Sequence, residues 1–140
     1  MLESARNAGV NVTYVSLMTM DFGGFFEKDI NNNPRTMGEM STSALADGAA
    51  QLQAIFGIGS AAAFKMIGVI PMIGLNDTPT EIFQVSDVRT VTDFVKQKGV
   101  GLVSFWGINR DQPGGSIDIA NGIGAGVFAF HNAFGAQGIK

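Results

Sequence analysis

The chain has 140 residues, enough for one ordinary domain, and 46% of them are apolar while only 15% are charged. Because a typical soluble domain carries about 25% charged residues, this surface is poor in charge, and we expect another chain or another piece of protein to cover part of it. The net charge of −3 and the absence of any run of Lys and Arg argue against nucleic acid as a partner. With no cysteine, disulfides and thiolate metal sites are excluded.

The sequence gives no sign of a membrane partner. It has no stretch of 18 or more apolar residues without polar breaks, as a spanning helix would need. The first ten residues, MLESARNAGV, lack the basic region and the apolar core of a signal peptide. The cellular location stays open.

The first half of the chain predicts a helix end, a strand and a long helix. Residues 1–9 are typical of the last turns of a helix that Gly9 closes, and residues 10–20 are rich in β-branched and apolar types, which favours a strand. After a polar loop, a helix begins near Thr36. Its apolar residues recur every three or four positions as far as Phe56, which indicates one buried stripe.

The second half continues the alternation of strands and helices. Residues 58–66 are compatible with either a helix tail or a loop, and residues 65–74 predict a second strand. Residues 86–99 predict an amphipathic helix that ends at a glycine, and residues 100–109 predict a third strand. The tail, 117–140, is expected to form a final helix after a Pro-Gly turn.

This order of elements indicates an α/β domain with parallel strands and helices packed outside them. The strands are nearly continuous apolar runs, which predicts a sheet buried on both faces. Each strand is followed by polar residues: Asp21, then Asn76 and Asp77, then residues 109–111. Since parallel α/β sheets bind ligands at the carboxyl ends of their strands, we expect a site at this edge.

Three segments, MTMDFGG, IGVIPMIGLND and LVSFWGINRD, in this order and spacing, resemble the family 18 glycoside hydrolases, the chitinases and their relatives. The resemblance covers residues 1–111. It implies a partial (β/α)8 TIM barrel of about three parallel βα units, equivalent to strands six to eight, with residues 1–140 as a single partial-barrel segment of a chitinase-like catalytic domain. The signature D-x-x-D-x-D-x-E on the family's fourth strand, which supplies the acid glutamate, has no match in this sequence.

The resemblance also implies roles for individual residues. Asp21 takes the place of the sixth-strand carboxylate that orients the substrate's acetamido group, and Trp106 takes the place of the flat floor under the sugar. Many family members carry Tyr at the position of Met20, and Met cannot donate the hydrogen bond that Tyr gives. The expected catalytic residue is Asp21, and the expected substrate-binding residues are Met18, Met20, Met72, Trp106, Asn76 and Arg110.

The chemistry implied by the resemblance is retaining hydrolysis in which the substrate's own acetamido oxygen is the nucleophile. It calls for no cofactor and no metal. The expected ligand is chitin or an N-acetylglucosamine oligosaccharide. Without the proton donor the chain is expected to be inactive alone, and its expected partner is either the missing N-terminal barrel half or a second copy of itself. Such enzymes are usually secreted.

Other interpretations of the same residues stay open. The chain could be a non-catalytic carbohydrate-binding or self-assembling module, or a small independent enzyme that uses Asp21, Asp77 and Asp111. Asp21 could only cap a turn, Met18 and Met20 could only pack, and Trp106 could be plain core. Residues 109–111 could form an ordinary loop with a surface ion pair, and His131 is expected to be structural.

Overall fold

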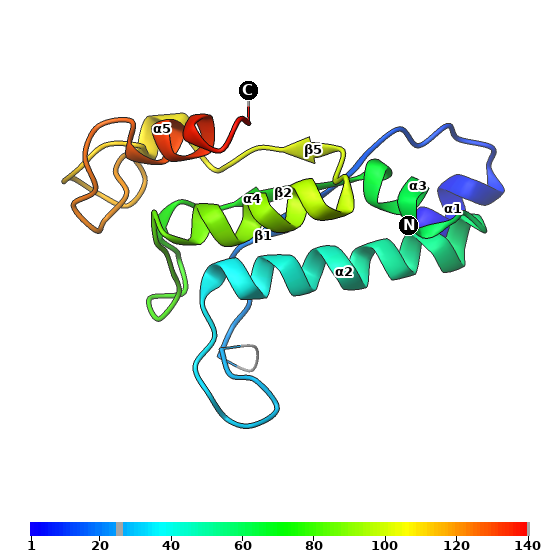
Figure 1. Ribbon diagram of the computed structural model, residues 1–140, viewed down its shortest axis with the longest axis horizontal. Helices are drawn as coiled ribbons and strands as arrows, with labels where there is room; N and C mark the ends of the chain where they lie inside the picture. The colour runs from blue at the N-terminus through cyan, green and yellow to red at the C-terminus, as the bar shows by residue number, and fades with distance from the viewer. Residues whose placement is uncertain (25–26, 140) are drawn as a thin grey trace.

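The structure is a computed structural model of the chain and describes residues 1–24 and 27–139. Helices lie over one face of a parallel sheet in the order β1-β2-β5 (Figure 1). The strands are β1 Val15–Thr19, β2 Ile67–Pro71, β3 Gly74–Leu75, β4 Ile82–Phe83 and β5 Leu102–Val103. The helices are α1 Leu2–Asn7, α2 Met37–Phe56, α3 Ser60–Met66, α4 Asp87–Lys98 and α5 Ala129–Ala136, with a 3-10 turn, η1, at Ile108–Arg110.

The register of the sheet places the ends of its strands at one edge. Val15 pairs with Ile67, and the pairing runs on to Thr19 opposite Pro71, while Val69 pairs with Val103. All three strands run parallel, so their carboxyl ends coincide, as the alternating pattern predicted. The short antiparallel hairpin of β3 and β4 at this edge was not predicted.

Helix α2 is the longest element and fixes the sheet from one side. A capping box at its start satisfies free backbone N–H groups: Thr36 Oγ1 accepts from Glu39 N at 3.1 Å, and a Glu39 carboxylate oxygen accepts from Thr36 N at 2.8 Å. Its close approach to the strands depends on Gly48, where a Cβ atom would lie 2.6 Å from an Ile67 methyl carbon. Leu17 lies against the same glycine, so the core forms between α2, β1 and β2.

The opposite face of the sheet is open, and the prediction of burial on both faces is wrong for this chain. Side chains alternate along a strand, and a Cβ atom on Gly68 would meet Ser16 and Leu102, which places these residues on the face away from α2. Met18, two residues after Ser16, is 64% exposed. Because the described residues include no second layer over this face, the apolar strands predicted from the sequence are only half covered.

The predicted strands were too long, while the helices were predicted closely. The first strand begins at Val15 rather than at residue 10, and β5 spans two residues, followed by a bridge between Met72 and Trp106. An outer strand pairs on one side only, so fewer of its residues meet a partner. The ambiguous segment 58–66 contains α3, and the tail forms loops before α5.

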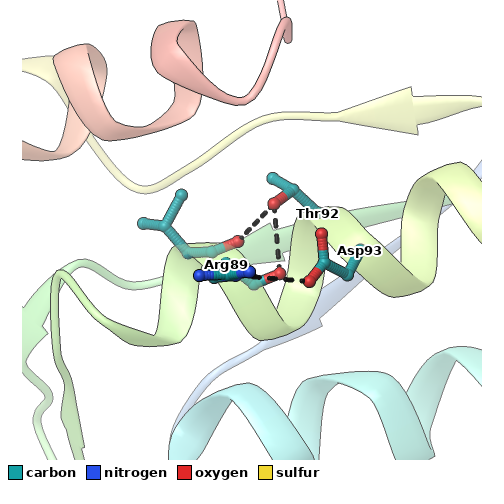
Figure 2. A network of polar contacts seen from close by, with 4 residues as sticks. Arg89, Thr92 and Asp93 are labelled. Atoms are coloured by element: carbon teal, nitrogen blue, oxygen red, sulfur yellow. Dashed lines mark hydrogen bonds and ion pairs between the residues drawn. The ribbon is translucent and has the colours of Figure 1, made fainter.

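Helix α4 carries an exposed ion pair on its outer side and a buried hydroxyl contact on its inner side. Arg89 Nε lies 3.6 Å from Asp93 Oδ2, and Thr92 Oγ1 donates to the Val88 carbonyl at 2.8 Å (Figure 2). The helix ends at Gly99, which adopts a left-handed conformation, as predicted. Within the described residues, no helix has both the length and the apolar character to cross a bilayer.

Candidate functional site

Trp106 lies at the carboxyl edge of the sheet, three residues after the end of β5. Its backbone N–H donates to the Pro71 carbonyl at 2.8 Å, and its own carbonyl accepts from Ile73 N at 2.9 Å. The peptide bond between Trp106 and Gly107 is cis. The side chain is 57% exposed, which excludes the interpretation of Trp106 as plain core. Its indole therefore offers an accessible apolar surface at the edge where a ligand was expected.

Asp21 follows β1 at the same edge and adopts a left-handed backbone conformation, with φ of 49°. Such a conformation is uncommon outside glycine and costs about 1–2 kcal/mol. Asp21 Oδ1 accepts from the backbone N–H of Thr78 at 2.7 Å, so the carboxylate joins two loops. This residue therefore does cap a turn, and its side chain is also exposed at the edge of the sheet.

Glu81 is a residue of this edge that sequence reasoning missed. Its side chain is 1% exposed, and its two carboxylate oxygens accept from the backbone N–H groups of Phe22 at 2.9 Å and Gly23 at 2.6 Å. It holds the turn that directly follows Asp21. The sequence carries no signal for it, because a glutamate in a polar turn is normally exposed.

Arg110 was expected at the rim of a substrate site, but its side chain is 1% exposed and lies inside the loop region. Its guanidinium donates to the carbonyl oxygens of Leu75 at 2.5 Å, Ile73 at 3.2 Å and Ile117. Burial lowers the pKa of Arg110 from its usual range, an effect that the nearby carboxylate of Asp77 opposes first and that of Asp21 more weakly. Arg110 thus fastens β3 to the loop that follows β5.

Asn76 lies beside this fastening and is also buried. Its amide nitrogen donates to the carbonyls of Met72 at 3.0 Å and Gly74 at 3.1 Å. Its Oδ1 atom and Arg110 Nε are buried without a hydrogen-bond partner among the described residues. In this structure, then, Asn76 and Arg110 contact backbone and shape the loops.

Within residues 1–24 and 27–139, Asp111 forms no surface ion pair. Its carboxylate is buried and accepts from Phe130 N at 3.0 Å and His131 N at 2.7 Å, which caps α5. This engagement leaves Asp111 poorly placed to act as an acid or base at the edge of the sheet, so the hypothesis of a small independent enzyme loses one of its three carboxylates.

The methionines of the predicted site divide between the two sides of the sheet edge. Met18 lies on the open face, Met20 is half-buried, and Met72 is buried, with its backbone bridged to that of Trp106. Asp21, Met20, Met72 and Trp106 thus lie beyond the ends of the strands, and Met18 lies one residue before the end of β1. Chemically, this edge offers a flat apolar surface and a carboxylate held by a backbone N–H. The described residues contain no cluster of three or more side chains suited to a metal ion.

Comparisons with known proteins point to one class of enzyme. The chain is 36% identical to the probable bifunctional chitinase/lysozyme of Escherichia coli (strain K12) over 118 residues, which is 83% of this chain and 13% of that protein. It is 35% identical to Endochitinase 11 of Metarhizium anisopliae over 115 residues, covering 81% of this chain and 22% of that protein. No protein-family model matches.

The fold agrees with the sequence comparison. The catalytic domain of a hyperthermophilic chitinase from Pyrococcus furiosus superimposes with a TM-score of 0.82 and 27% identity, over 97% of this chain and 43% of that chain. Catalytic-site mutants of the same chitinase complexed with chito-oligosaccharides match equally well. The predicted resemblance is confirmed: in sequence and fold the chain is similar to part of these chitinases, and it spans less than half the length of the proteins that it matches.

Proposed function

We propose that this chitinase-like segment is the substrate-orienting C-terminal part of a (β/α)8 catalytic barrel, in which it supplies strands six to eight. Its ligand is chitin or an N-acetylglucosamine oligosaccharide. The observation that carries the proposal is the position of Asp21 after β1 and of Trp106 after β5 at the carboxyl edge of one sheet, within a fold that resembles 43% of a chitinase catalytic domain.

The chemistry of this edge suits an N-acetylated sugar. The exposed face of Trp106 provides apolar surface for a pyranose ring. The Asp21 carboxylate, directed by its bond to Thr78 N, accepts a hydrogen bond from the acetamido N–H and so holds the acetamido oxygen toward the anomeric carbon. Met18 and Met20 line the adjoining wall. Met72 is bridged to the backbone of Trp106, and Asn76 and Arg110 hold the loops beside it through backbone carbonyls.

The open sides of the sheet support a partner that completes the barrel. Among the residues that the structure describes, both outer strands, β1 and β5, have one unpaired side, which favours further strand pairing. A cavity of about 410 Å³ lies between β5 and α5, with Phe105 and Phe134 in its lining, and another of about 240 Å³ lies between β1 and α2. These are the places where the neighbouring units of a closed barrel would pack.

The proton donor belongs, under this proposal, to the part of the barrel that this sequence does not include. None of the glutamates of the chain, Glu3, Glu27, Glu39 and Glu81, follows the aspartate series of the family's fourth strand. The chain alone is then inactive, because a retaining hydrolase needs a carboxylic acid on the leaving oxygen.

Sugar binding by the chain tests the first half of the proposal. Calorimetry with N-acetylglucosamine oligomers is expected to detect binding by the wild type, and the Trp106→Ala variant is expected to weaken it about 5- to 150-fold, since one stacked ring is worth about 1–3 kcal/mol. Tyr14→Ala is the matched control, because Tyr14 is an exposed aromatic residue that precedes β1, at the other end of the sheet. Equal losses in both variants would contradict a specific role for Trp106.

Complementation tests the second half. Mixing the chain with the N-terminal part of a related barrel is expected to restore cleavage of a chitin oligosaccharide, and the Asp21→Asn variant is expected to abolish it. A well-folded pair without activity would argue against the proposal. The alternative, a non-catalytic carbohydrate-binding or self-assembling module, is supported by the unpaired sides of β1 and β5; it predicts an oligomer of this chain that binds sugar without cleaving it.

A further inference from the structure

We infer that Glu81 is a positioning residue, whose buried carboxylate fixes the turn after β1 and thereby sets the direction of the Asp21 side chain. This inference rests on the proposed function, because it assumes that Asp21 orients the substrate. The contacts between Glu81 and the turn stand independently of that role.

The turn needs an outside partner to keep its shape. Asp21 has φ of 49° and Gly23 has φ of 79°, so two of three successive residues adopt a left-handed conformation. Such a sequence of conformations turns consecutive backbone N–H groups toward one point and forms a small anion-binding concavity. Here the N–H groups of Phe22 and Gly23 both donate to the Glu81 carboxylate, one to each oxygen.

The partner is buried and bound by backbone groups. Glu81 is 1% exposed, and within the described residues the only ion pair is the one between Arg89 and Asp93. A buried carboxylate without a cation is costly unless hydrogen bonds compensate it. Burial of a charged group at a free-energy cost is typical of functional sites, where the geometry of the side chains matters more than the stability of the fold.

The two loops hold each other reciprocally. Glu81 accepts from the turn after β1, and Asp21 Oδ1 accepts in return from Thr78 N in the loop that contains Glu81. That loop is closed on itself, since Asn76 N donates to the Glu81 carbonyl at 3.0 Å and Glu81 N to the Thr78 carbonyl at 2.9 Å. A change at Glu81 should therefore reach the Asp21 carboxylate through the turn.

The Glu81→Gln variant tests the inference with little change of shape. The Gln amide oxygen can replace only one of the two carboxylate oxygens, so it can accept from either Phe22 N–H or Gly23 N–H. The Gln NH₂ group would then face the other N–H donor. Asp87→Asn is the matched control, because Asp87 is also a buried carboxylate, and it accepts from the backbone N–H of Gln84 at 2.8 Å, away from the turn. Both variants remove a buried charge, but only the first touches the turn.

Nuclear magnetic resonance on the full 140-residue chain gives the first readout. In Glu81→Gln, amide exchange at Thr78 is expected to speed up about tenfold, and the carboxyl carbon resonance of Asp21 is expected to shift, because the Asp21 carboxylate would no longer be held against the Thr78 N–H. Asp87→Asn should leave both unchanged. Equal behaviour of the two variants at Thr78 and Asp21 would overturn the inference.

A second variant keeps the test decisive if Glu81→Gln does not fold. Glu81→Asp retains the charge but is shorter by one methylene, so it can reach only part of the turn, and an intermediate shift at Asp21 is expected. In the wild type, the amides of Phe22 and Gly23 should be protected from exchange to a similar degree. Exchange of both at the rate of an open loop would also overturn the inference.

Kinetics of the completed barrel give the second readout. Glu81→Gln is expected to lower kcat about tenfold or more with KM changed less than about threefold, because misorientation of a catalytic group affects the transition state more than binding. An unchanged kcat would contradict the positioning role. If the wild-type pair is inactive, the proposed function fails, while the resonance experiment still decides whether Glu81 holds Asp21.

Discussion

Arg110 occupies the centre of the loops that follow the sheet, and its buried guanidinium joins segments that are distant in the sequence. It binds the carbonyls of Ile73 and Leu75 from one side and that of Ile117 from the other. We predict that Arg110→Met lowers the free energy of unfolding by about 3 kcal/mol, because it leaves buried carbonyl groups without donors. Urea denaturation followed by circular dichroism measures this loss.

The matched control for Arg110 is Arg89, which forms an exposed ion pair on α4 (Figure 2). Such pairs contribute about 0–1 kcal/mol, so Arg89→Met is expected to change stability by less than about 0.5 kcal/mol. Similar effects of the two substitutions would show that the carbonyl contacts of Arg110 are replaceable by water.

The positions of single residues at the sheet edge were predicted unevenly from the sequence. Asp21 and Trp106 were placed correctly at the sheet edge, because they directly follow apolar strands whose ends are easy to recognise. Arg110 and Asn76 were expected at a rim and are buried, and Glu81 was missed. Burial of a polar residue in a loop depends on backbone groups contributed by other loops, and no local pattern in the sequence encodes those.

At the scale of elements, close packing between α3 and the start of β5 depends on Gly101. Its N–H donates to the carbonyls of Phe64 at 3.0 Å and Ile67 at 3.1 Å, and a Cβ atom would lie 1.8 Å from the Lys65 carbonyl oxygen. We predict that Gly101→Ala costs about 3 kcal/mol, because a backbone atom cannot move aside as a side chain can. Thermal unfolding of the purified variant checks this value.

Gly99, two residues earlier, provides the comparison. It has φ of 72°, but a Cβ atom added to it would lie within 4 Å of no other described residue apart from its two chain neighbours, so Gly99→Ala strains the backbone without a clash. We expect a cost of about 1 kcal/mol. An equal loss of stability in the two variants would mean that backbone strain, rather than contact with α3, determines whether this segment tolerates a substitution.

The helices were predicted more accurately than the strands, for a physical reason. The ends of α2 and α4 are marked by local chemistry, the capping residue Thr36 and the left-handed glycines Gly57 and Gly99. A strand ends where its neighbour ends, which is a property of the pairing. The two residues of β5 therefore could not be distinguished within the apolar run 100–109.

At the scale of the whole molecule, the low charge of the chain and its open sheet face both indicate a surface that another protein segment covers. The face away from α2 carries Met18 and Leu102 in exposed positions, and the sequence indicated a surface that other protein covers. An apolar sheet face without a second layer is costly in water. This agreement supports the proposal that the chain works within a larger barrel.

Trp106 is the only tryptophan in the sequence and lies at the edge of this face, so its fluorescence reports whether the face becomes covered. We predict that adding the N-terminal part of a related barrel shifts the emission to shorter wavelength and reduces quenching by acrylamide, because the indole loses contact with water. Titration of the partner at constant chain concentration measures both. A rise in chain concentration without the partner separates self-association from complementation. If the partner binds while quenching stays unchanged, Trp106 does not face the interior that the two parts enclose, and the proposed sugar floor is wrong.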